Sequence, residues 1–383
     1  MRLASLRTVQ WRTIEDREIE FSPGVNVLVG GNGQGKTNLL EAVQYLALGR
    51  SHRSARDDEI VRFGSGYFFV RGDGEGDAGQ AFSIEAGFTP PRSKRLKVDG
   101  RPLTRLTDLT GVLACVSFGP EDTELARGAP QLRRRYVDYT LAETSRASLK
   151  ALTEYRRVLQ QRGSLLRESD NSGSATSADL QVWDDELVRL GCDVVVRRAE
   201  ALLDLGPRAR TLHQALGVGA DLRLFYVVQA AGQRLEVGPA LQGFLARARE
   251  GALEEAFRAR LRQRRVAEQV RRANLVGPHR DDLEFELDGR DLRRYGSQGQ
   301  CRVAAVALKM AQAECIRERR QDRPVVVLDD VFAELDERRA AGLWEIVCKH
   351  HQTFLAVPRR SDVEFGEGDA IFRVESGVLT REK

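Results

Sequence analysis

The sequence predicts a mixed α/β fold in which both ends of the chain build one core and a helical lobe is inserted between them. A glycine-rich loop lies between an apolar strand run and a helix-forming run near residue 30. Helix-forming Leu, Ala, Arg and Glu dominate residues 120–273, and a second apolar strand run appears at residues 325–328. Strand runs at both ends of a chain, separated by helices, favour a shared sheet. The predicted domains are therefore a core of residues 1–119 and 274–383 and a helical insertion of residues 120–273.

The composition is that of an ordinary globular protein. The chain has 383 residues, of which 42% are apolar and 30% charged, and its formal net charge is only +4. This balance alone does not argue for a nucleic-acid partner. Five cysteines without a C-x-x-C pair argue against a zinc site or a disulfide framework and for a reducing compartment. Without a signal peptide or a long apolar span, we expect a cytoplasmic protein that does not enter a membrane.

The glycine-rich loop fits the phosphate-binding pattern G-x-x-x-x-G-K-[ST] at every position. Residues 25–29 form the preceding strand run and residues 39–48 the following helix run, which is the context that the pattern requires. Glycines let backbone N–H groups converge on phosphate oxygens, and the helix N-terminus adds positive potential. A chance glycine-rich turn is the alternative, and this context disfavours it. The predicted nucleotide-binding residues are Gly30, Gly31, Asn32, Gly33, Gln34, Gly35, Lys36, Thr37 and Asn38.

Two acids follow the second apolar run. In such sites the lysine, here Lys36, reaches the β- and γ-phosphates, and the Thr37 hydroxyl binds Mg²⁺. An acid at the end of a neighbouring strand holds the same metal, which is the role we predict for Asp329. Asp330 follows it, where a carboxylate could polarise the attacking water. An ordinary acidic turn is the alternative, but the sequence favours ATP and Mg²⁺ as cofactors.

A second anion-binding segment is predicted at residues 296–300, just before an amphipathic helix. Ser297, Gly299 and Gln300 belong to a short S-x-G-Q pattern at a helix start, although an N-cap serine with a flexible turn would look the same. The order of the motifs resembles that of ABC-type ATPases, with Asp330 in place of the usual Glu. In those heads the S-x-G-Q segment closes over the ATP of a second subunit. The resemblance therefore implies an ATP-dependent homodimer that separates after hydrolysis.

Several stretches also resemble the RecF recombination and repair proteins over nearly the whole chain. The matching stretches are residues 30–33, 36–42, 51–53, 118–122, 133–135, 160–162, 277–283 and 296–300. This resemblance implies an ABC-type P-loop ATPase head with a mixed sheet and an inserted helical lobe. It also implies a weak, DNA-stimulated ATPase that acts as a switch. The implied partners are DNA (gapped, duplex or single-stranded) and the proteins RecR, RecO and RecA, with the last loaded at single-strand gaps.

Two other functions remain open at this point. An ABC transporter ATPase subunit would couple to membrane proteins and would not bind DNA. An SMC-like DNA-tethering head would need long heptad arms, and the sequence shows no sustained heptad repeat. The helical insertion and the segment at residues 277–283 favour the repair function over the transporter subunit.

One position departs from the family pattern. Ala356 lies where the family usually ends a strand with a threonine that senses the γ-phosphate. An alanine has no hydroxyl, so we expect His350 or His351 nearby as alternatives.

Clusters of arginine give candidate DNA contacts. They are Arg133, Arg134 and Arg135 in one run and Arg258, Arg262 and Arg265 in a denser basic stretch. Either cluster could neutralise phosphates, and either could equally be a solvated helix face. Because no base-reading motif is present, binding should follow DNA structure rather than sequence. His279 to Asp282 are interpreted as a structural or nucleotide-interface loop.

Overall fold

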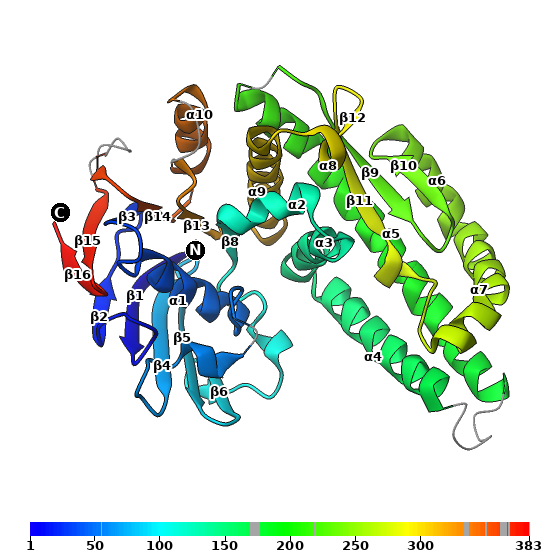
Figure 1. The fold of residues 1–383 in the computed structure, drawn as a ribbon, viewed down its shortest axis with the longest axis horizontal. Helices are drawn as coiled ribbons and strands as arrows, with labels where there is room; N and C mark the ends of the chain where they lie inside the picture. The colour runs from blue at the N-terminus through cyan, green and yellow to red at the C-terminus, as the bar shows by residue number, and fades with distance from the viewer. Residues whose placement is uncertain are drawn as a thin grey trace. The chain divides into compact units, whose positions relative to one another are not determined.

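The computed structural model describes residues 1–54, 56–168, 177–217, 219–332, 337–348, 351–360, 366 and 368–382. The chain divides into two compact units. The first unit contains Met1–Asp122, Ala215–Gly217 and Val306–Lys383, and the second contains Thr123–Gln214 and Val218–Ala305. Both ends of the chain thus belong to the first unit (Figure 1). Among the described residues, no helix has the length and apolar character needed to cross a membrane.

The first unit is built around a six-stranded sheet with the strand order β16-β15-β3-β14-β13-β8. Its strands are β3 (Val25–Val29), β8 (Cys115–Phe118), β13 (Val325–Asp329), β14 (Thr353–Val357), β15 (Ala370–Glu375) and β16 (Val378–Arg381). All neighbouring pairs are parallel except β15 with β16. The central strands are apolar and buried, as expected for a parallel sheet covered on both faces. Parallel strands end at one edge of the sheet, where ligands of α/β proteins bind.

A second, antiparallel sheet of the first unit has the order β2-β1-β4-β5-β6-β7. Its strands are β1 (Arg2–Val9), β2 (Arg17–Glu20), β4 (Phe68–Glu75), β5 (Ala81–Thr89), β6 (Ser93–Val98) and β7 (Arg101–Pro102). Helix α1 (Lys36–Leu48) contacts strands of both sheets. Trp11, Tyr45 and Phe68 pack edge to face with ring centroids 5.0–5.5 Å apart. The helix that follows the phosphate loop is thereby buried between two sheets. Helix α10 (Glu337–Cys348) completes this unit.

The second unit is mainly helical. Its helices are α2 (Glu124–Arg127), α3 (Pro130–Thr144), α4 (Arg146–Glu168), α5 (Ser177–Ala215), α6 (Pro239–Arg249), α7 (Ala252–Arg271), α8 (Leu292–Tyr295) and the first part of α9 (Gln298–Arg320). They accompany a sheet of order β10-β9-β11-β12, made of β9 (Leu222–Val228), β10 (Gln233–Glu236), β11 (Asp282–Leu287) and β12 (Arg290–Asp291).

The observed division differs from the predicted one at residue 274. We placed residues 274–305 in the core, whereas they group with the second unit. The reason is strand pairing, because β11 pairs antiparallel with β9 along its whole length, from Asp282 opposite Val227 to Leu287 opposite Leu222. The domain boundaries predicted from the sequence, 1–119 with 274–383 and 120–273, remain a prediction.

Candidate nucleotide site

The phosphate loop connects β3 to α1, and its backbone geometry requires glycine. Gly33 and Gly35 have φ angles of 76° and 109°, in the left-handed region that favours glycine. A β-carbon at Gly30 would lie 2.3 Å from the carbonyl oxygen of Val374. Side chains are therefore excluded from the loop by local conformation at two positions and by the neighbouring strand β15 at a third. The backbone N–H groups of such a loop are left accessible to phosphate oxygens.

Lys36 lies at the start of α1 and is almost fully buried. Its Nζ donates hydrogen bonds to the carbonyl oxygens of Gly30 and Gly31, at 2.7 and 3.1 Å. The ammonium group is thus folded back over the loop that we predict to bind phosphates. A compact cation in this position can neutralise phosphate charge without moving the helix.

Thr37 and Asp329 meet at the carboxyl edge of the parallel sheet. The Thr37 side chain lies next to the Asp329 carboxylate. Asp329 ends β13 and is 9% exposed, and burial raises the pKa of its carboxyl above the ordinary 3.8. The Asp330 charge raises this pKa further, whereas the neighbouring Thr37 side chain lowers it. Structure thus brings together two residues that lie far apart in the sequence.

These two side chains fit a magnesium ion. The Oδ1 atom of Asp329 is buried and lacks a hydrogen-bond partner within the described part of the chain. Hydroxyl and carboxylate oxygens are the hard donors that Mg²⁺ takes, usually with several water molecules and the phosphates of a nucleotide. The Oδ1 atom of Asp329 is therefore free to accept a metal ion beside Thr37 in the described part of the chain.

Asp330 follows Asp329 in an unusual backbone conformation. Its φ angle is 50°, in the left-handed region that residues other than glycine rarely adopt. Strain of this kind collects at functional sites, where the surrounding structure enforces it. It turns the chain immediately after β13, next to the proposed metal ligand. The role predicted for Asp330, polarising the attacking water, remains a prediction.

A turn near the end of the chain braces the phosphate loop. Between β15 and β16, the N–H groups of Ser376 and Gly377 donate to the Oε1 and the carbonyl oxygen of Gln34, at 2.7 and 2.9 Å. A β-carbon at Gly377 would lie 1.8 Å from the carbonyl oxygen of Thr13, so the N-terminal segment also contacts this turn. Sequence reasoning missed both segments. The glycine in a short turn between two strand runs was the only signal.

An ion-pair network holds the other side of α1. Glu41 is fully buried on this helix, and Arg12 and Arg53 both pair with its carboxylate, at 2.8 and 3.4 Å. Asn38 joins the same network, because Arg53 donates to its Oδ1 at 3.1 Å while its own Nδ2 donates to Thr13 Oγ1 at 2.9 Å. Asn38 was predicted to belong to the nucleotide site, and it links the loop to the arginines around it. The roles of Arg12 and Glu41 were missed.

Strand β14 lies between β3 and β13, so its carboxyl end points to the same edge as the loop and Asp329. The N–H of Gly30 donates to the carbonyl oxygen of Val357 at 3.3 Å. Ala356 is paired with Leu28 and Asp329 and offers no hydroxyl there. The expectation that His351 senses the γ-phosphate is wrong. His351 precedes β14 and therefore lies at the opposite edge of the sheet, and His350 lies outside the described residues.

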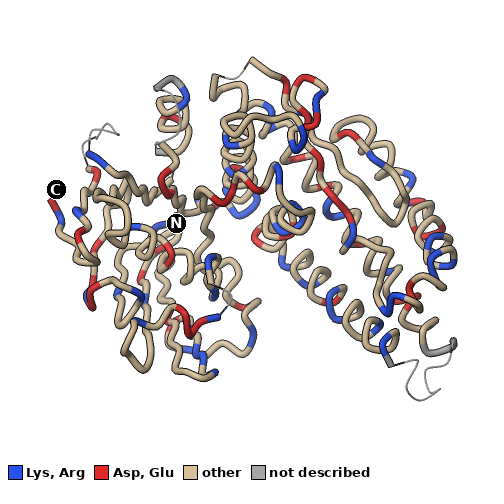
Figure 2. Tube along the Cα trace, in the orientation of Figure 1, with Lys and Arg blue, Asp and Glu red and all other residues tan. Residues whose placement is uncertain are grey.

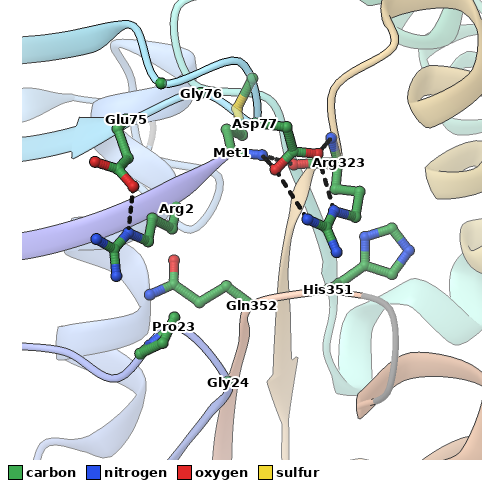
Figure 3. Close-up of a pocket in the computed structure, with 11 residues that line it drawn as sticks. Met1, Arg2, Pro23, Gly24, Glu75, Gly76, Asp77, Arg323, His351 and Gln352 are labelled. Atoms are coloured by element: carbon green, nitrogen blue, oxygen red, sulfur yellow. Dashed lines mark hydrogen bonds and ion pairs between the residues drawn. The ribbon is translucent and has the colours of Figure 1, made fainter.

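Figure 3 shows the surroundings of His351, a pocket of about 380 Å³ at this opposite edge. Ion pairs line it, with Arg2 Nε 2.9 Å from Glu75 Oε1 and Arg323 Nε 2.9 Å from Asp77 Oδ2. Gln352 is buried beside it and donates to the carbonyl oxygen of Leu3 at 2.8 Å. The pocket borders the amino ends of the strands, so it is separate from the candidate nucleotide site.

The S-x-G-Q segment belongs to the second unit. Ser297 is exposed and precedes α9, where its Oγ accepts from the N–H of Gln300 at 3.2 Å. Gln300 returns the contact, because its Oε1 accepts from the N–H of Ser297 at 2.8 Å. This is a reciprocal helix cap. Gly299 lies in the first turn of α9, where a β-carbon would meet no atom within 4 Å. The cap interpretation is thus correct for Ser297, and a nucleotide contact remains a prediction.

The arginines predicted to contact DNA have different environments. Arg133 requires a correction, because it is 2% exposed and forms two hydrogen bonds to Asp282, at 2.8 and 2.9 Å. A buried, fully paired guanidinium cannot face a phosphate. Arg134 is half-buried and donates to the carbonyl oxygen of Asp281, while Arg135 is exposed.

The α7 arginines are also divided. Arg258 pairs with Glu254 and Asp185, and Arg265 pairs with Asp184. Arg262 is exposed, and the structure gives it no ion pair with any described residue. Only Arg135 and Arg262 of the six candidates are therefore exposed.

The segment at residues 277–283 is a structural centre of the second unit. Asp281 is fully buried, and its carboxylate accepts from the Tyr226 hydroxyl at 2.5 Å and from the N–H of Gln229 at 2.8 Å. Arg198 lies 3.4 Å from the same carboxylate. His279 shares a hydrogen bond of 2.7 Å with Tyr155, and burial lowers the pKa of His279 to about 4. Of the two interpretations of this loop, structural or nucleotide-interface, these contacts support the structural one.

Comparison with known proteins gives concordant matches over the full chain. The family model described as "RecF/RecN/SMC N terminal domain" matches residues 2–377. A DNA replication and repair protein RecF from Heliobacterium modesticaldum is 40% identical over 385 residues, covering 100% of this chain and 99% of the relative. A solved structure of the recombination mediator protein RecF with ATP, from the RecFOR pathway, is 30% identical with a TM-score of 0.88 and covers 100% of this chain and 97% of that one. An Smc head structure, 16% identical with a TM-score of 0.57, covers 99% of this chain and 96% of that one and shares the fold.

Proposed function

This chain belongs to the RecF family of DNA replication and repair proteins, and we propose that it acts as an ATP-controlled switch on DNA. The observation that carries this proposal is the placement of Thr37 next to Asp329, near the buried Lys36. It joins the phosphate loop to the acids at the end of β13 within one unit, where ATP and Mg²⁺ would bind together. When bound, the metal would neutralise the charge that develops on the phosphates during hydrolysis.

Each residue of the candidate nucleotide site has its own part in the proposed reaction. Backbone N–H groups of residues 30–35 bind phosphate oxygens, and Lys36 Nζ moves from the loop carbonyls to the β- and γ-phosphates. Thr37 and Asp329 would supply the hydroxyl and carboxylate oxygens that hold the metal. Asp330 accepts a proton from the attacking water or polarises it. A short acid in place of the longer Glu reaches less far, which suits the slow hydrolysis of a switch.

Dimerisation on ATP is the second part of the proposal. Ser297 is exposed at the start of α9, where backbone N–H groups and the helix dipole favour an anion. We infer that the segment of one protomer, with Gly299 and Gln300, closes over the γ-phosphate bound by its partner. Hydrolysis then removes the shared ligand and releases the dimer.

The dimer would act on gapped or duplex DNA in the cytoplasm, with RecO and RecR, to help load RecA at single-strand gaps. Affinity for single-stranded DNA would be a lesser part of the same activity. DNA should stimulate the weak ATPase, because closure of the dimer assembles the catalytic groups.

Sedimentation velocity tests the proposal directly. The protein is compared with ATP and Mg²⁺, with ADP, and without nucleotide, each with and without gapped duplex DNA. We expect a dimer only with ATP and Mg²⁺, and a larger complex when DNA is added. A monomer under all conditions would overturn the switch, and a dimer indifferent to DNA would instead favour a transporter-like subunit.

A further inference from the structure

A basic, exposed segment of the first unit has no assigned role. Residues 92–105, here called the basic hairpin, comprise β6, β7 and their flanks and contain six arginines and lysines against one aspartate. Lysines and arginines recur along the β6 segment (Figure 2). We propose that the basic hairpin binds the phosphate backbone of DNA. This inference rests on the proposed function and gives it a surface.

Most cations of the basic hairpin are not neutralised by the protein. The structure gives no ion pair, among the residues it describes, to Arg92, Arg95, Arg101 and Arg105, and all four are exposed. The single acid, Asp99, is not paired with any of them in the described part of the chain, and its carboxylate accepts from the N–H of Ser83 at 2.9 Å. Four unpaired guanidinium groups on a short stretch repel one another, so an external anion would stabilise them.

The other two cations anchor the hairpin. Lys97 lies 3.4 Å from Glu85 on the neighbouring strand. Lys94 Nζ is 2.7 Å from Asp57 Oδ2 and 4.9 Å from the centre of the Tyr45 ring, while the Tyr45 hydroxyl donates to Asp57 at 2.9 Å. Tyr45 belongs to α1, so Lys94 binds the hairpin to the helix that follows the phosphate loop. Its fixed position means that a docked phosphate backbone would meet a rigid surface.

Apolar contacts support the same attachment. A β-carbon at Gly49, the C-cap of α1, would lie 2.3 Å from Leu106 and 3.3 Å from Leu96. Side chains alternate along a strand, so Lys94 and Leu96 lie on the face toward α1, whereas Arg95 lies on the opposite face. The hairpin thus packs on the end of the helix whose other end carries Lys36 and Thr37. DNA and ATP would bind at the two ends of one helix of about 20 Å.

The basic hairpin is a stronger candidate than the basic stretch on α7. On α7, Asp184, Asp185 and Glu254 neutralise Arg258 and Arg265. The four hairpin arginines form no ion pair with any residue that the structure describes. Arginines in a segment that has no base-reading motif suit contacts to the phosphate backbone. Such contacts position a duplex but do not read its bases.

Salt-dependent binding of a short gapped duplex, followed by fluorescence anisotropy with ATP and Mg²⁺, tests the inference. The test variant is R92Q/R95Q/R101Q/R105Q, and the charge-retaining counterpart has lysine at the same four positions. The matched rival is R262Q/R264Q/R271Q on the exposed side of α7. Thermal unfolding of each variant confirms that the fold is retained.

At every salt concentration from about 50 to 200 mM, we expect the glutamine variant to bind at least about tenfold more weakly than the wild type. The slope of log K against log [salt] should be smaller in magnitude than that of the wild type by about 3 to 4. The lysine variant and the α7 variant should bind within about threefold of the wild type. The inference would be overturned, with the proposed function untouched, if the glutamine variant kept the wild-type affinity and slope. The same holds if the lysine variant lost as much affinity as the glutamine variant. A wild-type protein that binds no DNA at any salt would overturn the proposed function as well.

Discussion

Arg12 holds the carboxylate of Glu41 with two hydrogen bonds, 2.9 Å from Nε and 2.8 Å from Nη2. Glu41 is fully buried on α1, one turn after Thr37, and Ser51 also donates to it. Burial opposes its ionisation, but the hydrogen bonds from Arg12 and Ser51 outweigh that effect, and the pKa of Glu41 lies below the ordinary 4.5. The helix that positions the phosphate loop is therefore held by a buried charge pair.

We predict that Glu41→Ala lowers the free energy of unfolding by about 3 to 5 kcal/mol, because it removes the buried carboxylate with which both Arg12 and Arg53 pair. Glu75→Ala is the matched control. Its pair with Arg2 is solvent-exposed, so its loss should cost about 0 to 1 kcal/mol. Urea unfolding of the two variants measures both values. Equal losses would show that the Arg12–Glu41 pair does not stabilise the helix.

The same pair predicts a pH dependence. Because the pKa of Glu41 is lowered on folding, its contribution to stability is complete above about pH 4.5 and is lost as the pH falls through the folded value. The stability difference between the wild type and Glu41→Gln should therefore shrink below pH 4.5. Urea midpoints measured from pH 7 down to the acid limit of the fold test this, and a constant difference would contradict it.

Asp329→Asn should uncouple nucleotide binding from magnesium. The variant keeps the size and part of the hydrogen bonding of Asp329 but removes the charge that would hold the metal. We expect ATP affinity in excess chelator to be unchanged, whereas the gain in affinity on adding Mg²⁺ should fall by about tenfold or more. Lys36→Arg is the comparison, because it should weaken hydrolysis with the metal response retained. An unchanged magnesium response in Asp329→Asn would exclude Asp329 as a ligand.

Ser297→Ala should abolish dimerisation on ATP and leave binding of ATP to the monomer intact. The substitution also removes a helix cap, at a cost of about 1 kcal/mol, which needs a control. Ser145→Ala provides it, because the Ser145 hydroxyl accepts from the N–H of Ser148 at the start of α4 in the same unit. Sedimentation should show a dimer for Ser145→Ala but not for Ser297→Ala. Dimers of both variants would rule out the trans contact.

Arg162 should show strong coupling to its buried partners. It is fully buried and donates to Asp184 at 2.7 Å and to Glu268 at 2.5 Å. Arg162→Met leaves the buried Glu268 without its cation and leaves Asp184 with Arg265 alone, and it should cost about 3 to 5 kcal/mol. Adding Glu268→Gln should recover part of that loss. A double-mutant cycle by urea unfolding measures the coupling, and additive losses would argue against the pair.

The sequence predicted the parts of the site that depend on neighbouring residues. The strand, loop and helix from Val25 to Leu48 were predicted because each signal lies within a few residues of the next. The strand β13 and its two acids were recognised for the same reason. Thr37 and Asp329 could be assigned to one metal because their residue types are specific to that chemistry.

What failed depended on distant partners. Arg133 lies in a run of three arginines that looks like a surface patch, but Asp282, which buries it, is 149 residues away. His351 is close to Ala356 in the sequence, yet the extended strand between them separates the two edges of the sheet. Strand β11 was assigned to the core because nothing local indicates that it pairs with β9. Local patterns do not encode such pairings.

The turn at Ser376 and Gly377 has a genetic consequence. It touches Gln34 inside the phosphate loop, although every recognisable motif precedes it in the reading frame. A nonsense codon just ahead of this turn would spare all of those motifs and still remove the support beneath the loop. Such an allele would look nearly intact in a genome, yet cells carrying it would behave like a deletion strain.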